Sequence, residues 1–317
     1  MKRAPIALFA AAFVWGLSVP LATTVLRGLT AADLVLVENV SGTAIVAVAA
    51  LALGRPLLGA WRPAVVLGAL EPGLAYVLVN LGLQRTSAAA GAILLALESA
   101  FIALLGWLVL GERLRRPEGA ALTLGLVGAV LVALAESGGA TSAVGNVLVV
   151  LGALVAALYA VAARRLALGA DPIGLVFRQG VAAIALTLPY VLWSWHHQGS
   201  RLTAAPPHII GLACLEGLVG FAVPFVLWSY AAPHVRTGVA GVAVNLVPVV
   251  GVITAAVAGL GRPTPVQLLG GALILGGMGL LSRGDDVVDE SDARAPEEIS
   301  VPWTRPPVAQ LDRAADF

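Results

Sequence analysis

The sequence is poor in charge and in cysteine. Only 12% of its 317 residues are Asp, Glu, Lys or Arg, about half the share in ordinary soluble domains, and the formal net charge is +1. Such a chain lacks the basic face that nucleic-acid binding requires, which argues against a nucleic-acid partner. The single cysteine, Cys214, excludes an intramolecular disulfide and a cysteine-based metal cluster.

The sequence also lacks the motifs of common enzyme classes. It contains no phosphate-binding loop and no Gly-x-Ser-x-Gly segment. The string from Asp285 to Asp289 resembles a diphosphate-binding Asp-Asp-x-x-Asp motif, but it follows the last apolar run instead of lining a helical cavity. His196, His197 and His208 are too loosely spaced for a convincing metal site. We therefore expect no enzymatic activity, no cofactor and no metal.

Long apolar runs are what the sequence has in abundance. The hydrophobic share is 59% and the mean hydropathy is +0.93. About 20 apolar residues in a helix cross the hydrocarbon core of a bilayer, and glycine and proline mark the turns between runs. The pattern predicts an all-α integral membrane protein with ten transmembrane helices, at residues 5–26, 32–53, 64–84, 87–110, 117–136, 145–166, 172–194, 209–231, 238–260 and 264–282.

Basic residues predict the orientation, because Lys and Arg concentrate in cytoplasmic loops. If the N-terminus is inside, most basic loop residues are cytoplasmic, and the outer loops carry Arg27, Arg85, Arg201 and Arg262. We therefore predict a multi-pass protein of the plasma (inner) membrane, surrounded by lipid, with both termini in the cytoplasm. Aromatic residues near the predicted helix ends are interpreted as interface anchors: Trp107, Tyr190, Trp193, Trp195 and Trp228.

The apolar runs fall into two successive sets of five that resemble each other. Ser87 and Thr237 open the fourth and ninth runs, and similar small and apolar residues follow each of them. Because five is odd, the second set must enter the membrane in the opposite direction. This predicts two inverted repeats, 5–136 and 145–282, of the kind found in many secondary transporters. Residues 283–317 are predicted to be a disordered cytoplasmic tail.

Several short motifs occur in the order of a known family: Trp15-Gly16, Leu97-Glu98, Leu110-Gly111-Glu112-Arg113-Leu114, Ala157-Leu158-Tyr159 and Leu246-Val247-Pro248. In this order they resemble the drug/metabolite transporter superfamily in its ten-helix, EamA-type form. The resemblance implies a permease that works by alternating access, and it favours efflux over uptake. The chain departs from the family where Glu38 stands in place of an arginine, and where Ser99 follows Glu98 in place of a proline.

Ionisable side chains inside membrane helices are costly and usually functional. In the predicted helices Glu98 is central, Glu38 and Glu216 lie in the outer third, and Glu71 and Arg178 lie in the inner third. Matching depths predict that Arg178 pairs with Glu71, and that Glu38 lies beside Glu216, where two carboxyls can share a proton. We predict that these four residues bind a coupling proton or ion. For any single glutamate, a protonated and silent side chain stays an open alternative.

A second set of residues is predicted to contact the substrate. Glu98 lies near the bilayer centre, and Trp15 lies in mid-helix, where its indole N–H needs an acceptor. Asn245 precedes Pro248 on the same helix face. Tyr76 and Tyr159 complete the predicted set.

These patterns together predict a secondary transporter of a small metabolite. The substrate would be an amino acid, an amine or a drug-like compound, with export preferred to import. Four acidic groups suit an amine-bearing substrate, or proton exchange with a neutral one. An importer stays open as an alternative, as does a non-transporting membrane protein such as a lipid-modifying enzyme or a sensor. The predicted partners are the small-molecule substrate and lipid, and both a monomer and a homodimer stay open.

Overall fold

The computed structural model describes residues 3–110, 119–120, 123–124, 127–128, 131, 143–235, 240, 243–244, 246–260 and 263–285. Within these residues the chain forms helices and short connections, and no strand is found. The predicted tail beyond residue 285 and most of the predicted helix 117–136 lie outside the described residues. The described part therefore agrees with the predicted all-α membrane fold.

In the described residues before 111, the chain forms four apolar passes, two of which are interrupted. They are α1 (Arg3–Val25), α2 (Ala31–Ala52), the series α3 (Trp61–Gly68), η1 (Ala69–Leu74) and α4 (Ala75–Leu83), and the pair α5 (Ala88–Leu95) and α6 (Leu97–Leu110). The segment η1 is one turn of π-helix that contains Glu71 and Pro72. Proline removes a backbone donor and disfavours a regular helix around it. A turn at Ala96 separates α5 from α6.

The second part begins with two long helices, α8 (Ala143–Leu166) and α9 (Pro172–Gln198). The next pass is again interrupted, since α10 (Pro207–Glu216) and α11 (Val223–Ala231) flank the π-helical turn η2 (Gly217–Ala222), and the 3-10 turn η3 (Ala232–His234) follows. The last described helices are α13 (Leu246–Val257) and α14 (Pro265–Asp285).

Seven passes in the described residues are long and apolar enough to cross a membrane: Arg3–Val25, Ala31–Ala52, Trp61–Leu83, Ala88–Val109, Ala143–Leu166, Pro172–Gln198 and Pro207–His234. They coincide with seven of the ten predicted helices. The predicted helix 264–282 corresponds to α14, and 238–260 is described in part and contains α13. The interruptions η1 and η2 are not among the sequence-based predictions.

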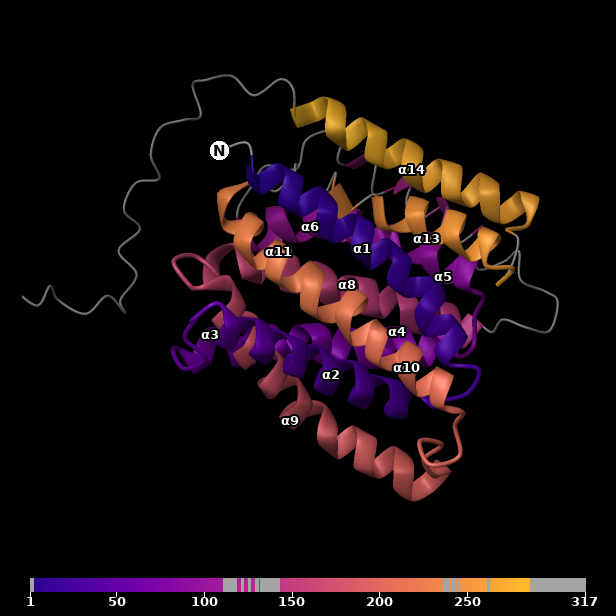
Figure 1. Ribbon diagram of the computed structural model, residues 1–317. Coiled ribbons are helices and arrows are strands. Elements are labelled where there is room, and N and C mark those ends of the chain that lie inside the picture. Colours follow the sequence, from indigo (N-terminus) through magenta and orange to yellow (C-terminus); the bar gives the residue numbers. More distant parts are fainter. Residues whose placement is uncertain are drawn as a thin grey trace, which may run out of the picture. The chain divides into compact units, whose positions relative to one another are not determined.

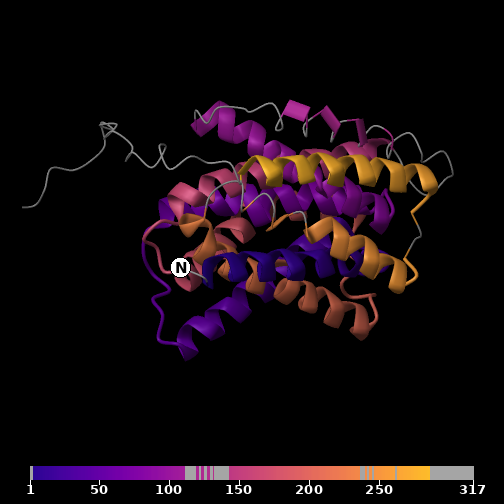
Figure 2. The same cartoon turned by 90° about the horizontal axis from the view of Figure 1, so that it is seen from above.

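Helices from the two parts of the chain pack against each other. Helix α1 lies between α11 and α13, α4 packs on α8, and α2 packs on α9 (Figures 1 and 2). Each π-helical turn is also covered by a helix from the other part, because α9 contacts η1 and α2 contacts η2. Exposed apolar side chains such as Val48, Leu51 and Leu192 lie on the outer surface, as expected of helices that face lipid.

Glycine allows the close contact between α2 and η2. A side chain built at Gly42 would touch the Phe221 ring and would lie 2.6 Å from the Gly217 carbonyl oxygen. A side chain at Gly217 would lie 2.7 Å from the carbonyl oxygen of Glu38. Small residues let two helix backbones approach each other inside a membrane, and here they bring Glu38 close to the end of α10.

The start of α2 is tied to the connection between α9 and α10. Thr30 and Asp33 form a capping box, in which each side chain accepts a hydrogen bond from the backbone of the other. The carboxylate of buried Asp33 also accepts hydrogen bonds from Trp195 Nε1 (2.9 Å), Ser200 Oγ (2.7 Å) and the Arg201 backbone N–H (3.0 Å). Asp33 therefore joins three segments at one end of the helices.

Candidate transport cavity

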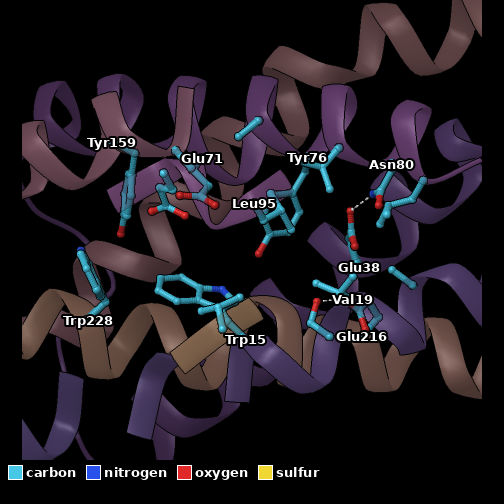
Figure 3. A pocket seen from close by; sticks show the side chains of 18 residues that line it. Trp15, Val19, Glu38, Glu71, Tyr76, Asn80, Leu95, Tyr159, Glu216 and Trp228 are labelled. Atoms are coloured by element: carbon cyan, nitrogen blue, oxygen red, sulfur yellow. Dashed lines mark hydrogen bonds between the residues drawn. The ribbon is translucent and has the colours of Figure 1, made fainter. Parts of the chain in front are cut away.

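A cavity lies among the helices from both parts of the chain. The empty space between its side chains, including the part that is open to solvent, has a volume of about 750 Å³. Four glutamates line it, and they come from α2, η1, α6 and α10 (Figure 3). The complete lining is Trp15, Ser18, Val19, Ala22, Glu38, Glu71, Ala75, Tyr76, Val79, Asn80, Leu83, Leu95, Glu98, Ala156, Tyr159, Glu216, Trp228 and Val247.

Glu38 and Glu216 form one end of this cavity. Both side chains are 1% exposed, and Figure 3 shows them next to each other. Glu38 Oε1 accepts a hydrogen bond from Asn80 Nδ2 (2.8 Å), and Glu216 Oε1 accepts one from the Ser18 hydroxyl. The structure thus brings together the two carboxyls that matching depth predicted to be neighbours, and it holds each with a neutral donor.

Glu71 and Glu98 line the same cavity, from η1 and α6. Glu71 follows the start of η1, and Gln179 of α9 donates a hydrogen bond to its backbone carbonyl (2.6 Å). Glu98 lies in the first turn of α6, directly after the interruption at Ala96. Figure 3 shows Glu71 beside Tyr159, on the side of the cavity away from Glu38.

Aromatic rings occupy the space between the two acidic ends. The indole of Trp15 and the hydroxyl of Tyr76 both donate hydrogen bonds to the carbonyl oxygen of Gly220, in η2, with a distance of 2.8 Å for Trp15. The Trp15 ring also packs on Phe225 and Trp228, at centroid distances of 5.2 and 5.5 Å. The acceptor that the Trp15 indole needs is therefore provided by the interrupted helix.

Arg178 does not line this cavity, and the predicted ion pair with Glu71 is not formed. Its Nη1 donates instead to the carbonyl oxygen of Leu57 (3.1 Å), beside Gly59. The reason is the rotation of α9 about its own axis, which turns Gln179 towards η1 and Arg178 towards the connection after α2. The predicted substrate-contacting residue Asn245 lies outside the described residues.

Sequence reasoning missed three polar residues of the cavity. Ser18 lies one turn after Trp15 on the same helix, and that spacing was a usable signal. Asn80, on α4, is a polar residue within an apolar run and is not among the predicted site residues. Trp228, predicted to be an interface anchor, is 1% exposed and faces the cavity. The anchor interpretation of Trp228 is wrong, because α11 turns this ring inwards against Trp15.

The cavity is acidic and has unused hydrogen-bonding groups. Among the described residues that line it there is no Lys, Arg or His. Glu216 Oε2 and Trp228 Nε1 are buried without a hydrogen-bond partner in the described part of the chain. A buried polar group without a partner is costly, so such atoms commonly bind a ligand or water. An amine-bearing molecule would satisfy the carboxyls of this cavity.

Comparison with known proteins identifies the family. A model of the EamA-like transporter family matches residues 2–134 and 143–283. The chain belongs to the EamA-like transporter family. It is also 28% identical over 286 residues to a protein of Streptantibioticus cattleyicolor named "Probable terminal-alkyne amino-acid exporter", with 89% of this chain and 94% of that protein covered.

A solved structure supports the fold of this EamA-type chain. A crystal structure of a protein with 22% sequence identity superimposes with a TM-score of 0.66, over 90% of this chain and 99% of the other. Family membership and the apolar passes together identify a multi-pass membrane transporter of small molecules. They point to a transporter rather than an enzyme.

Proposed function

We propose that this EamA-type transporter exports small metabolites that carry an amine group, amino acids among them, across the plasma membrane. The observation that carries the proposal is the convergence of four glutamates on one cavity whose described lining has no basic side chain. An ammonium group pairs with carboxylates and forms up to three hydrogen bonds. The relative named as an amino-acid exporter supports this substrate class and the outward direction.

Transport would proceed by alternating access of two inverted five-helix halves, 5–136 and 145–282. Two observations support this arrangement. The family model matches the chain twice, and each half contains one pass interrupted by a six-residue π-helical turn next to a glutamate, Glu71 in η1 and Glu216 before η2. Interrupted helices at the midplane are common at the binding sites of such transporters. The distribution of basic residues supports a cytoplasmic location of both termini.

The paired carboxyls support coupling of transport to protons. Two carboxyls that lie close together tend to share one proton instead of carrying two charges. Arrival of an ammonium group would displace that proton, and departure of the substrate would allow it to return. Export of an amine would then be exchanged for protons at the Glu38–Glu216 end, the Glu71–Glu98 end, or both.

The test is transport in proteoliposomes that contain the full-length protein. Vesicles preloaded with unlabelled amino acids and amines should take up the labelled compound by exchange, and a pH gradient should change the rate. Glu216→Gln keeps the shape and the Ser18 hydrogen bond but removes the charge, and it should slow exchange about tenfold or more. Asp171→Asn is the matched control, because Asp171 lies outside the cavity and Asn also caps helices.

The control variant should exchange substrate at a rate close to that of the unmodified protein. Equal exchange by Glu216→Gln and the unmodified protein would contradict the role of the cavity carboxyls. Efflux from preloaded cells that exceeds uptake separates an exporter from an importer. The absence of exchange for every amine and amino acid tested would contradict the proposed substrate class.

A further inference from the structure

The two ends of the cavity differ in their hydrogen-bonding groups. Figure 3 shows Trp228 on the side of Tyr159 and Glu71, whereas Glu38, Asn80 and Glu216 lie on the other side, with Trp15 between. Among the described residues, neither the indole N–H of Trp228 nor the hydroxyl of Tyr159 has a hydrogen-bond partner. Donors of this kind bind acceptors, and an ammonium group is not an acceptor. The Trp228 side therefore suits a molecule that has an acceptor group next to its ammonium group.

The other end offers an acceptor without a donor. Glu216 Oε2 has no hydrogen-bond partner in the part of the chain that the structure describes. Ser18 donates to the other oxygen of Glu216, and Asn80 donates to one oxygen of Glu38. A second ammonium group would satisfy Glu216 Oε2. Figure 3 shows Glu71 and Asn80 towards opposite ends of the cavity, with Tyr76 between them. A ligand that contacts both ends must therefore be extended.

The stretch between the ends suits an apolar chain. The Trp15 ring and Leu95 lie in this part of the cavity (Figure 3). Trp15 and Tyr76 already use their polar atoms on Gly220. The methylene chain of a lysine-like side chain packs well on such surfaces while its charged end seeks a polar partner. The middle thus favours methylene groups over a further polar group.

We propose that the cavity binds α-amino acids whose side chain ends in a second ammonium group. The α-carboxylate accepts the hydrogen bond of Trp228 Nε1, and the α-ammonium lies between Glu71 and Glu98. The side-chain ammonium lies between Glu38 and Glu216, where Glu216 Oε2 accepts its hydrogen bond. This inference rests on the proposed function and narrows its substrate class.

Three probes separate the parts of this proposal. L-Lysine has all three charged groups, L-norleucine lacks the side-chain ammonium, and 1,5-diaminopentane lacks the α-carboxylate. Binding to the purified full-length protein is measured by titration calorimetry. L-Lysine should bind about tenfold or more tightly than either other probe, because each of them loses one charge-assisted interaction. Equal affinities for L-lysine and L-norleucine would overturn the proposal.

A substitution tests the assigned donor. Trp228→Phe keeps a ring but removes the N–H, so it should weaken L-lysine binding about tenfold more than 1,5-diaminopentane binding. The matched control is Trp107→Phe, because Trp107 is 46% exposed and does not line the cavity. That control should leave the ratio of the two affinities unchanged. An equal loss for both probes in Trp228→Phe would overturn the assignment of the carboxylate.

Exchange in the proteoliposomes described above distinguishes a failure of this inference from a failure of the proposed function. Exchange of a monoamine or a neutral amino acid, without binding of L-lysine, would overturn the diamino acid proposal and leave the proposed function standing. The absence of exchange for all amines would overturn both. Exchange of L-lysine that is inhibited by unlabelled L-lysine more strongly than by L-norleucine would support both.

Discussion

The contact between α2 and η2 leads to a prediction in which two local effects have opposite signs. Gly42 lies inside α2, where replacement of glycine by alanine in an open helix position stabilises by up to about 1 kcal/mol. At this position, however, the new methyl carbon would lie 2.6 Å from the carbonyl oxygen of Gly217 and would also touch the Phe221 ring. Ordinary contacts of such a carbon are 3.4–4 Å. The two helices would therefore have to separate by about 1 Å, against the close packing of protein interiors.

The expected size of the effect follows from these distances. Overpacking of a tight site costs about 1–3 kcal/mol, and the upper value applies because one opposing atom is a backbone oxygen that cannot rotate away. Subtracting a propensity gain of about 1 kcal/mol leaves a net loss of about 2 kcal/mol for Gly42→Ala. Separation of α2 from η2 would also move Glu38 away from Glu216, so substrate exchange should slow as well.

The assay is thermal unfolding of the purified protein in detergent, followed by tryptophan fluorescence. Gly211→Ala in α10 is the matched control, because a methyl group there would meet no atom within 4 Å. We expect the midpoint to fall for Gly42→Ala and to stay equal or rise slightly for Gly211→Ala. A rise of similar size in both variants would refute the reasoning, since helix propensity alone would then explain the result.

Two further predictions concern shared hydrogen bonds. Trp15→Phe and Tyr76→Phe should each lower the free energy of unfolding by about 1 kcal/mol or less, because the other donor still satisfies the Gly220 carbonyl. The double substitution should lower it by about 1–3 kcal/mol more than the sum of the two single effects. Thermal unfolding of all three variants checks this, and strictly additive effects would contradict it. Asp33→Ala removes the carboxylate that accepts three hydrogen bonds from α9 and the loop that follows it. Limited proteolysis should therefore cut that loop faster than in the unmodified protein. An unchanged cleavage rate would contradict the role of Asp33 in holding the loop.

Much of the membrane topology follows from the sequence alone. Hydrophobicity and helix length are local properties, and the cost of a charge in the bilayer depends on its position along one helix. For this reason seven predicted passes coincide with helices in the described residues. Glu38, Glu71, Glu98 and Glu216 stand out in the sequence for the same reason, and the structure places all four around one cavity.

Only the tertiary structure decided which way each side chain points. The rotation of a helix about its axis depends on partners that are distant in sequence, so the turn of Arg178 away from Glu71 and of Trp228 into the cavity depends on packing between the two parts of the chain. The π-helical turns have a similar origin. Gln179 and Gly42 lie on helices of the opposite part, and they satisfy or make room for the interrupted backbone of η1 and η2. A single-sequence pattern contains no information on such contacts, because they exist only once the helices are packed.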